Sequence, residues 1–355
     1  FRSISAFRSI SAFRSISAFR SISAFRVLPL LLLACFLLAA CSDDDPVLQT
    51  HYVNPVWTPD GKTLVAGYDE ALSTEIAPSA GRTVTRLAVK DIASRVTRIV
   101  DLGVVSTWHT LYAFDPSGTA LAFVENGRIL FHDLQGRQLL SFQPTVGGVP
   151  RLLAFQNTGN SFVWVGVTAD GYTVNLNTYD AATWAALETT TLETVQSAEA
   201  VLSLALTSQR SYALRLSSGL VREVDFNGTE LNSFNIGTLT RDNPWHERLV
   251  YYSALGARYL YAVDGNGMMR LDLSTGAADN LVKGTIMDFD MSDQRMSMVY
   301  ETRTGDIWLS TSDGVPLQRM APQNLMPRFS PAANGVAMVT RVDPYMDSLH
   351  VLLYR

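Results

Sequence analysis

A strand–turn–strand unit that recurs seven times is the feature that most constrains how this chain can fold. Each unit has an apolar run, a short turn of Pro, Asp, Ser, Gly or Asn, and a second apolar run. The turns fall near residues 59, 116, 157, 208, 254, 292 and 331. Spacings of roughly 38–57 residues are typical of a repeat architecture in which every unit forms one small sheet.

A second hairpin follows the first in four of these units. Its turns are Gln135-Gly136, Asn227-Gly228, Thr275-Gly276 and Asp313-Gly314. Gly suits the last position because it accepts the positive φ that tight hairpins require. Four strands in about 45 residues are typical of a β-propeller blade. We therefore predict an all-β fold for residues 48–355, a β-propeller of seven four-stranded blades, with six or eight blades as the alternatives.

The last unit, residues 326–355, is too short for a complete blade. It has room for about three strands of ordinary length. A ring that does not close exposes unpaired strand edges, which proteins avoid. We therefore expect residues 48–53, at the other end of the domain, to supply the missing outer strand.

Three of the turns share a motif. Trp57-Thr58-Pro59-Asp60-Gly61 matches the Trp/Phe-Ser-Pro-Asp-Gly element of bacterial propellers of the TolB type, which are related to WD-repeat proteins. Phe114-Asp115-Pro116-Ser117-Gly118 and Phe329-Ser330-Pro331 match it in part, and the middle four units depart from it. Over residues 50–355 the chain thus resembles TolB-type propellers. The resemblance implies a rigid disc that docks other envelope proteins or peptides.

The first 40 residues have a different organisation. Residues 1–26 are four copies of FRSISA and the start of a fifth, with an Arg in each, and residues 27–40 are almost wholly apolar. This apolar run is shorter than the roughly 20 residues of a membrane span, and it follows positive charge, as in a secretory signal. We interpret residues 1–26 as a lengthened n-region or a mis-called start, and 27–40 as the hydrophobic region of a cleaved signal peptide.

The end of this run resembles the lipobox of bacterial lipoproteins. Its four residues are Leu38, Ala39, Ala40 and Cys41. In that family the Cys thiol is acylated and the peptide is cut directly before it. Residues 41–47 would then be the lipidated Cys41 and an acidic tether. An ordinary signal peptide that contains Cys, or a short anchor helix, is the alternative interpretation.

The residue after Cys41 bears on localisation. In enterobacterial lipoproteins an Asp there favours retention at the inner membrane, whereas this chain has Ser42. The resemblance therefore implies an outer-membrane lipoprotein that faces the periplasm, with the inner membrane or the cell surface as alternatives. Cys35 and Cys41 are the only cysteines, so the mature domain would contain no disulfide.

The sequence contains no recognisable catalytic motif, since it lacks G-x-S-x-G, a P-loop, H-E-x-x-H and C-x-x-C. Its five His are isolated, and Asp288, Asp290 and Asp293 lack the Gly and the final Glu of a calcium loop. We therefore predict no catalytic residues, no metal and no cofactor.

Two Trp-His pairs are candidate binding residues for a sugar or a peptide. Trp108-His109 and Trp245-His246 directly precede inner-strand pairs, where connections reach a face of a propeller. Without residues 1–40 the chain has 23 basic and 33 acidic residues. An acidic body without a basic cluster argues against a nucleic-acid partner.

The leading hypothesis is a non-catalytic scaffold lipoprotein, held at the membrane by its lipid and docking an envelope protein or peptide on a propeller face. One alternative is a propeller-type enzyme (a lyase, lactonase or cyclase) with a metal or acid site at the channel mouth. The other is a glycan-binding protein. His and carboxylate side chains that converge in the central channel would favour the enzyme. Trp and Tyr side chains exposed on one face of the propeller would favour the glycan-binding protein.

We predict that the mature protein begins at acylated Cys41. Intact mass spectrometry of the membrane-bound protein should give the mass of the chain from Cys41 plus acyl groups. Cys41→Ala should remove the lipid, whereas Cys35→Ala, inside the apolar run, should not. FRSISA peptides in the membrane-bound protein would contradict this prediction.

Overall fold

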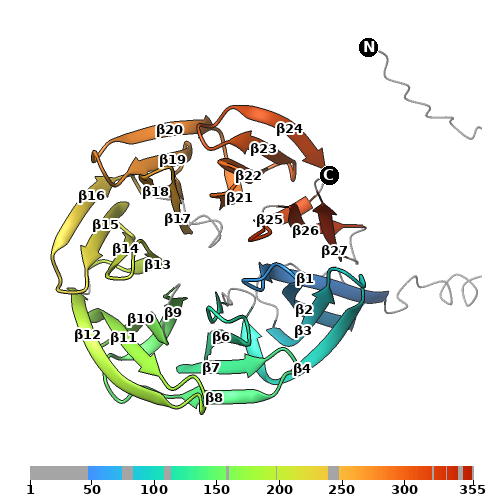
Figure 1. Cartoon of the computed structure of the whole chain (residues 1–355), viewed down its shortest axis with the longest axis horizontal. Coiled ribbons are helices and arrows are strands. Elements are labelled where there is room, and N and C mark those ends of the chain that lie inside the picture. Colours follow the sequence, from blue (N-terminus) through green and yellow to red (C-terminus); the bar gives the residue numbers. More distant parts are fainter. Residues whose placement is uncertain are drawn as a thin grey trace, which may run out of the picture. The chain divides into compact units, whose positions relative to one another are not determined.

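A computed structural model describes residues 47–73, 83–107, 113–156, 160–196, 198–238, 248–321, 324–332, 334–342 and 347–353. These residues form strands and turns arranged as a ring of seven small sheets (Figure 1). Within each sheet, every strand is hydrogen-bonded to the strand that follows it in the sequence, so each sheet is a meander built from local hairpins. The predicted all-β, seven-bladed propeller is confirmed. No helix in the described residues is long and apolar enough to cross a membrane.

The seven blades follow one another in chain order, and in each the first strand is innermost (Figure 1). Blades 1 to 4 are β1 (Val47–Trp57), β2 (Thr63–Ser73), β3 (Thr83–Asp91), β4 (Thr97–Thr107); β5 (Ala113–Phe114), β6 (Ala120–Glu125), β7 (Arg128–Asp133), β8 (Gln138–Phe142); β9 (Val149–Phe155), β10 (Ser161–Thr168), β11 (Gly171–Tyr179), β12 (Ala186–Gln196); and β13 (Val201–Leu206), β14 (Ser211–Leu216), β15 (Leu220–Asp225), β16 (Glu230–Asn235). Blades 5 to 7 are β17 (Leu249–Ala254), β18 (Ala257–Val263), β19 (Gly267–Asp272), β20 (Ala278–Lys283); β21 (Ile286–Ser292), β22 (Ser297–Thr302), β23 (Ile307–Thr311), β24 (Pro316–Ala321); and β25 (Asn324–Phe329), β26 (Gly335–Arg341), β27 (Asp347–Leu353).

The Pro-containing motif forms the tight turn between the first and second strands. In blade 1, the Gly61 N–H donates to the Thr58 carbonyl at 2.8 Å, and the Thr58 hydroxyl donates to the Asp60 carboxylate at 2.7 Å. In blade 2, the Gly118 N–H bonds the Asp115 carbonyl at 2.9 Å. Both glycines have positive φ, 68° and 74°, which explains why Gly ends the motif. The motif therefore has a structural role, which is to form a tight turn.

An Asp at the end of the third strand closes the outer hairpin. The Asp133 carboxylate accepts the N–H groups of Gln135 and Arg137, both at 2.9 Å. Asp225 and Asp272 accept backbone N–H groups of their own turns in the same way. An Asp that bonds its own backbone two residues on is a common way to fix a turn. The predicted QG, NG, TG and DG hairpins are confirmed.

The core lies between blades, where apolar side chains of successive sheets pack face to face. Blades 2 and 3 share a cluster that contains Phe131, Phe162 and Trp164, all with no exposed surface. Trp184 stacks on Tyr179 beside it, with ring centroids 5.3 Å apart. Trp57 and Trp308 belong to clusters at two other junctions. These four Trp residues thus fill gaps between blades.

The expectation for ring closure is wrong. Residues 48–53 belong to β1, the innermost strand of blade 1, and blade 7 has three strands among the described residues. The ring closes through side chains instead: Leu64 and Ala66 of blade 1 pack against Ala337 and Val339 of blade 7. The physical reason is continuity, because the turn at residues 58–61 needs a strand directly before it and β1 runs unbroken through residues 47–57.

Two glycines in equivalent turns, Gly136 and Gly276, allow a test of how tightly the outer hairpins pack. A Cβ on Gly136 (φ 85°) would lie 2.5 Å from Val100 and 2.6 Å from the Asp101 carbonyl, whereas one on Gly276 (φ 73°) meets nothing within 4 Å. Both Ala variants carry the strain of positive φ, but only Gly136→Ala also forces β4 and the hairpin apart. We expect Gly136→Ala to lose about 2 kcal/mol more unfolding free energy than Gly276→Ala. Equal losses in denaturant titrations would contradict this packing.

Candidate functional site

The sequence-predicted site residues lie outside the described part of the chain. This holds for the lipobox with Cys41 and for both Trp-His pairs, Trp108-His109 and Trp245-His246. They stay predictions. The described residues offer two other features near the inner strands, one apolar and one charged.

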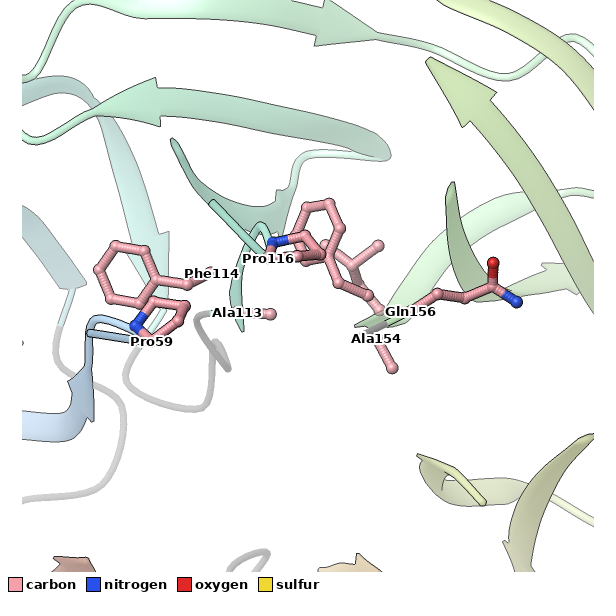
Figure 2. Close-up of a pocket in the computed structure, with 8 residues that line it drawn as sticks. Pro59, Ala113, Phe114, Pro116, Ala154 and Gln156 are labelled. Atoms are coloured by element: carbon pink, nitrogen blue, oxygen red, sulfur yellow. The ribbon is translucent and has the colours of Figure 1, made fainter. Parts of the chain in front are cut away.

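The apolar feature is a hollow of about 460 Å³ where the innermost strands of blades 1, 2 and 3 end (Figure 2). We call it the blade 1–3 hollow, and it is lined by Pro59, Ala113, Phe114, Pro116, Leu153, Ala154, Phe155 and Gln156. Its lining thus comes from the two Pro-containing turns and from the end of β9. The residues that carry the TolB-type motif form part of its wall.

The positions of these turns follow from the hairpin geometry. The turns of blades 1 and 2 touch, since a Cβ on Gly118 would lie 3.0 Å from the Pro59 ring. Gln156 is tied to the next blade, because its side-chain amide donates to the Gln209 carbonyl at 2.9 Å. Short turns and contacts between blades therefore hold the walls of the hollow in place.

The hollow has the chemistry of a binding surface more than that of a reaction centre. Prolyl, phenyl and aliphatic groups form most of its wall, and the Gln156 amide is the polar side chain among its lining residues. The nearby Asp115 is buried, and its carboxylate already accepts the N–H groups of Ser117 and Ala120 at 3.0 and 2.6 Å. A hollow of this size can accept one or two apolar side chains of a ligand.

The charged feature joins blades 5, 6 and 7. The Arg328 guanidinium on β25 bonds Asp288 on β21 at 2.7 Å, and both side chains are buried. Arg248, directly before β17, reaches Asp290 at 3.2 Å and the Phe289 carbonyl at 2.9 Å. We call these four residues the Asp288 cluster. Its carboxylates are engaged by arginines of neighbouring blades, so Asp288 and Asp290 hold blades together.

Glu301 on β22 lies beside this cluster and is also buried. Its carboxyl group accepts the Met326 N–H at 3.0 Å, which links blade 6 to blade 7. Burial raises the pKa of Glu301 to about 8, and the charge of Asp288 adds to the shift. The group is therefore largely protonated at neutral pH.

The histidines of the described residues do not assemble a metal site. No group of three or more His, Cys, Asp or Glu in this part of the chain could hold a metal ion. His132 is buried in blade 2, where its Nδ1 lies 3.1 Å from the Gly136 carbonyl and burial lowers its pKa. His350 is exposed on β27.

The arginine partners of Asp288 and Asp290 are the site residues that sequence reasoning missed. Arg248 and Arg328 each lie about 40 residues from their partners, on other blades. Only the propeller topology brings such positions together, and no spacing rule within one repeat reveals the pairing. The one signal that the sequence offered was an Arg inside a strand, Arg328 of β25.

Comparison with known proteins supports the fold class alone. No family model and no curated protein matches the sequence. Among solved structures, the chain is similar to the Cps50 (Swd1) β-propeller domain of Myceliophteria thermophila, with a TM-score of 0.59, 11% identity, and coverage of 86% of this chain and 98% of that one. It is also similar to U3-55K (TM-score 0.58, 16% identity, 83% and 91% coverage). A third similar structure is an oligogalacturonate lyase in complex with manganese (TM-score 0.58, 13% identity, 87% and 91% coverage).

The sheet topology and these likenesses define the fold class: the protein is a seven-bladed β-propeller. Propellers of this class often serve as binding scaffolds, and identities this low carry no specific activity over.

Glu301 gives a prediction on pH dependence. Its folded pKa, about 8, is above the ordinary value of 4.5 for Glu, so its contribution to stability is fully present below about pH 4.5 and is lost as pH rises through 8. Glu301→Gln keeps a neutral acceptor for the Met326 N–H and removes this dependence. We expect the two proteins to unfold alike at pH 5, and the variant to be more stable by roughly 2–4 kcal/mol at pH 9. If the unfolding free energies of the two proteins differed by the same amount at every pH from 5 to 9, the raised pKa of Glu301 would be contradicted.

Proposed function

We propose that this protein is a non-catalytic binding scaffold that docks a protein or peptide partner through the blade 1–3 hollow. The observation that carries the proposal is the apolar wall built by Pro59, Phe114, Pro116 and Leu153 at the ends of inner strands. Apolar surface that stays open on a folded domain commonly marks an interaction site. Held by short turns, this wall loses little conformational entropy when a ligand binds.

The hollow favours a peptide over a glycan. Sugars are bound by stacking on flat aromatic faces together with many polar groups, whereas this lining has two Phe and one amide side chain. An extended peptide segment with a Pro or another bulky apolar residue matches the lining better. The side chain would enter the hollow, and the Gln156 amide would lie within reach of the peptide backbone.

We further propose that the propeller is tethered at a bacterial membrane through acylated Cys41. Support comes from the order Leu38, Ala39, Ala40 and Cys41 after an apolar run, and from the acidic stretch that follows. Tethering would concentrate the propeller at the envelope, where an attached partner meets it at high effective concentration. The expected partner is therefore another envelope protein.

The enzyme alternative has a distinct signature. One of the similar propellers is an oligogalacturonate lyase in complex with manganese. Metal analysis of the purified protein distinguishes the two functions, because a scaffold needs no stoichiometric metal. A tightly held metal ion, lost together with a measurable lyase activity on chelation, would favour the enzyme.

Filling the hollow should abolish partner binding. Ala154 lines the hollow, whereas Val149 lies at the other end of the same strand and is 58% exposed. We expect Ala154→Trp to reduce partner recovery from envelope membranes at least tenfold, and Val149→Trp to leave it unchanged. Quantitative mass spectrometry of captured proteins measures both, and melting temperatures confirm that both variants fold. Undiminished capture by Ala154→Trp would overturn the assignment of the hollow.

A further inference from the structure

A second hollow, of about 280 Å³, lies between blades 5 and 6, which follow each other in the ring (Figure 1). One of its walls is the connection from β20 to β21, at Lys283, Gly284 and Thr285. The other wall is the turn from β22 to β23, at Arg303 and Thr304. We call it the blade 5–6 hollow.

This hollow opens on the face of the propeller opposite to the blade 1–3 hollow. The turns that follow innermost strands, such as those at Pro59 and Pro116, reach one face. In an antiparallel meander the next turn, from the second strand to the third, reaches the other face, and the β22–β23 turn is of this kind. A ligand in one hollow therefore leaves the other hollow free.

Backbone hydrogen bonds hold both walls of the blade 5–6 hollow in place. The Gly284 N–H donates to the Asn266 carbonyl in the β18–β19 turn at 2.8 Å. The Arg303 N–H donates to the Thr285 carbonyl at 3.2 Å, which joins one wall to the other. The shape is thus set before a ligand arrives, and binding costs little ordering of the backbone.

The lining also includes apolar side chains. Ile286 and Tyr300 are buried and belong to the cluster shared by blades 5 and 6. The volume is slightly below the roughly 300–1,000 Å³ that is usual for a pocket holding a drug-sized ligand. The hollow therefore suits a small molecule, or one end of a larger one, that has an apolar part.

Two cationic side chains line the hollow without a counter-ion among the described residues. Lys283 and Arg303 are exposed, and neither side chain pairs with a carboxylate in this part of the chain. The other two lysines of the sequence are both engaged. Lys62 pairs with a carboxylate of its own turn at 3.3 Å, and Lys90 donates to a backbone carbonyl at 2.8 Å. The ammonium group left for a ligand is thus the one beside an unpaired guanidinium.

The carboxylates of the adjoining turns are engaged elsewhere. Asp306, at the end of the β22–β23 turn, bonds Arg319 at 2.6 Å and accepts the Thr304 hydroxyl at 3.2 Å. Asp264, in the β18–β19 turn, accepts two backbone N–H groups of that turn at 2.8 and 2.7 Å. The positive charge of the hollow is therefore available to a ligand.

We infer that the blade 5–6 hollow binds an oxyanion, a carboxylate or a phosphate, that is attached to a small apolar group. The Arg303 guanidinium can bond two oxygens of such a group at once, and the Lys283 ammonium adds a compact charge. The Thr285 hydroxyl, which has no hydrogen bond to another described residue, can donate to the same oxygens. The apolar part would lie against Ile286 and Tyr300. This site is separate from peptide docking in the blade 1–3 hollow and does not depend on it.

The probes are benzoate and phenyl phosphate, and benzamide is a neutral control with the shape of benzoate. We expect at least one of the two anions to bind the full chain with a Kd of about 1 mM, and to shift the amide NMR signals of residues 282–286 and 300–304. Benzamide should bind at least tenfold more weakly, because it loses the charge-assisted hydrogen bonds. Added salt should weaken anion binding, since exposed charges are screened. The anion that binds more tightly identifies the oxyanion.

Three variants provide matched controls within the protein. Arg303→Gln and Lys283→Gln should each weaken anion binding at least fivefold. Arg210→Gln should change nothing, because Arg210 is equally exposed but lies in the β13–β14 turn on the opposite face. Melting temperatures show that all three fold. Ala154→Trp should leave anion binding intact, so failure of this inference is distinguishable from failure of peptide docking.

Three results would overturn the inference. One is the absence of NMR shifts at residues 282–286 and 300–304 with either anion. Another is equal affinity for benzamide, which would mean that the hollow selects an apolar group alone. The last is unchanged binding in both Arg303→Gln and Lys283→Gln, which would place the anion elsewhere on the protein.

Discussion

The packing of apolar side chains between blades is the interaction on which this fold depends. Hydrogen bonds join strands within each blade, and every sheet is a local meander. Nothing in that ladder connects one blade to the next. The ring is therefore held by the clusters at its junctions, such as Val163, Tyr212 and Leu214 between blades 3 and 4. Each fully buried large side chain contributes about 2–3 kcal/mol by leaving water, which makes the junctions, more than the sheets, the source of stability.

Buried ion pairs also join neighbouring blades at these junctions. Glu223 of blade 4 has no exposed surface and bonds Arg258 of blade 5, just as Asp288 of blade 6 bonds Arg328 of blade 7. Desolvation makes a buried pair a weak source of net stability, whereas breaking one leaves an uncompensated charge. Such pairs therefore act mainly on specificity: a blade placed one position out of register would leave a buried carboxylate alone. This matters for a repeat protein, whose blades otherwise present similar apolar faces.

The sequence predicted what is local, and it failed where the answer depends on contacts between repeats. Turn chemistry is local, so the motif at residues 57–61 and the Gly136, Gly228, Gly276 and Gly314 hairpins identified the blades and their number. The way in which the ring closes is not set by the local sequence. Residues 48–53 precede the first turn, and by pattern alone their partner could be either blade 1 or blade 7. The Arg248 and Arg328 partners lie about 40 residues from the carboxylates they bond. The hollow joins turns of three blades, and the Glu301 carboxyl meets the Met326 N–H of the next blade. The ring brings all these positions together.

The blade 1–3 hollow follows from a departure from perfect repetition. Blades 1 and 2 carry Pro in the turn after the innermost strand, whereas blade 3 presents Gln156 there, so the turns cannot pack uniformly and a gap lined by Pro59 and Pro116 results. Among the described residues, blade 7 has three strands where each other blade has four. A seven-fold ring of identical blades would bury such surfaces evenly and offer no preferred place to bind. The irregular blades are therefore where function is expected, because repetition builds the disc and its interruptions expose apolar side chains.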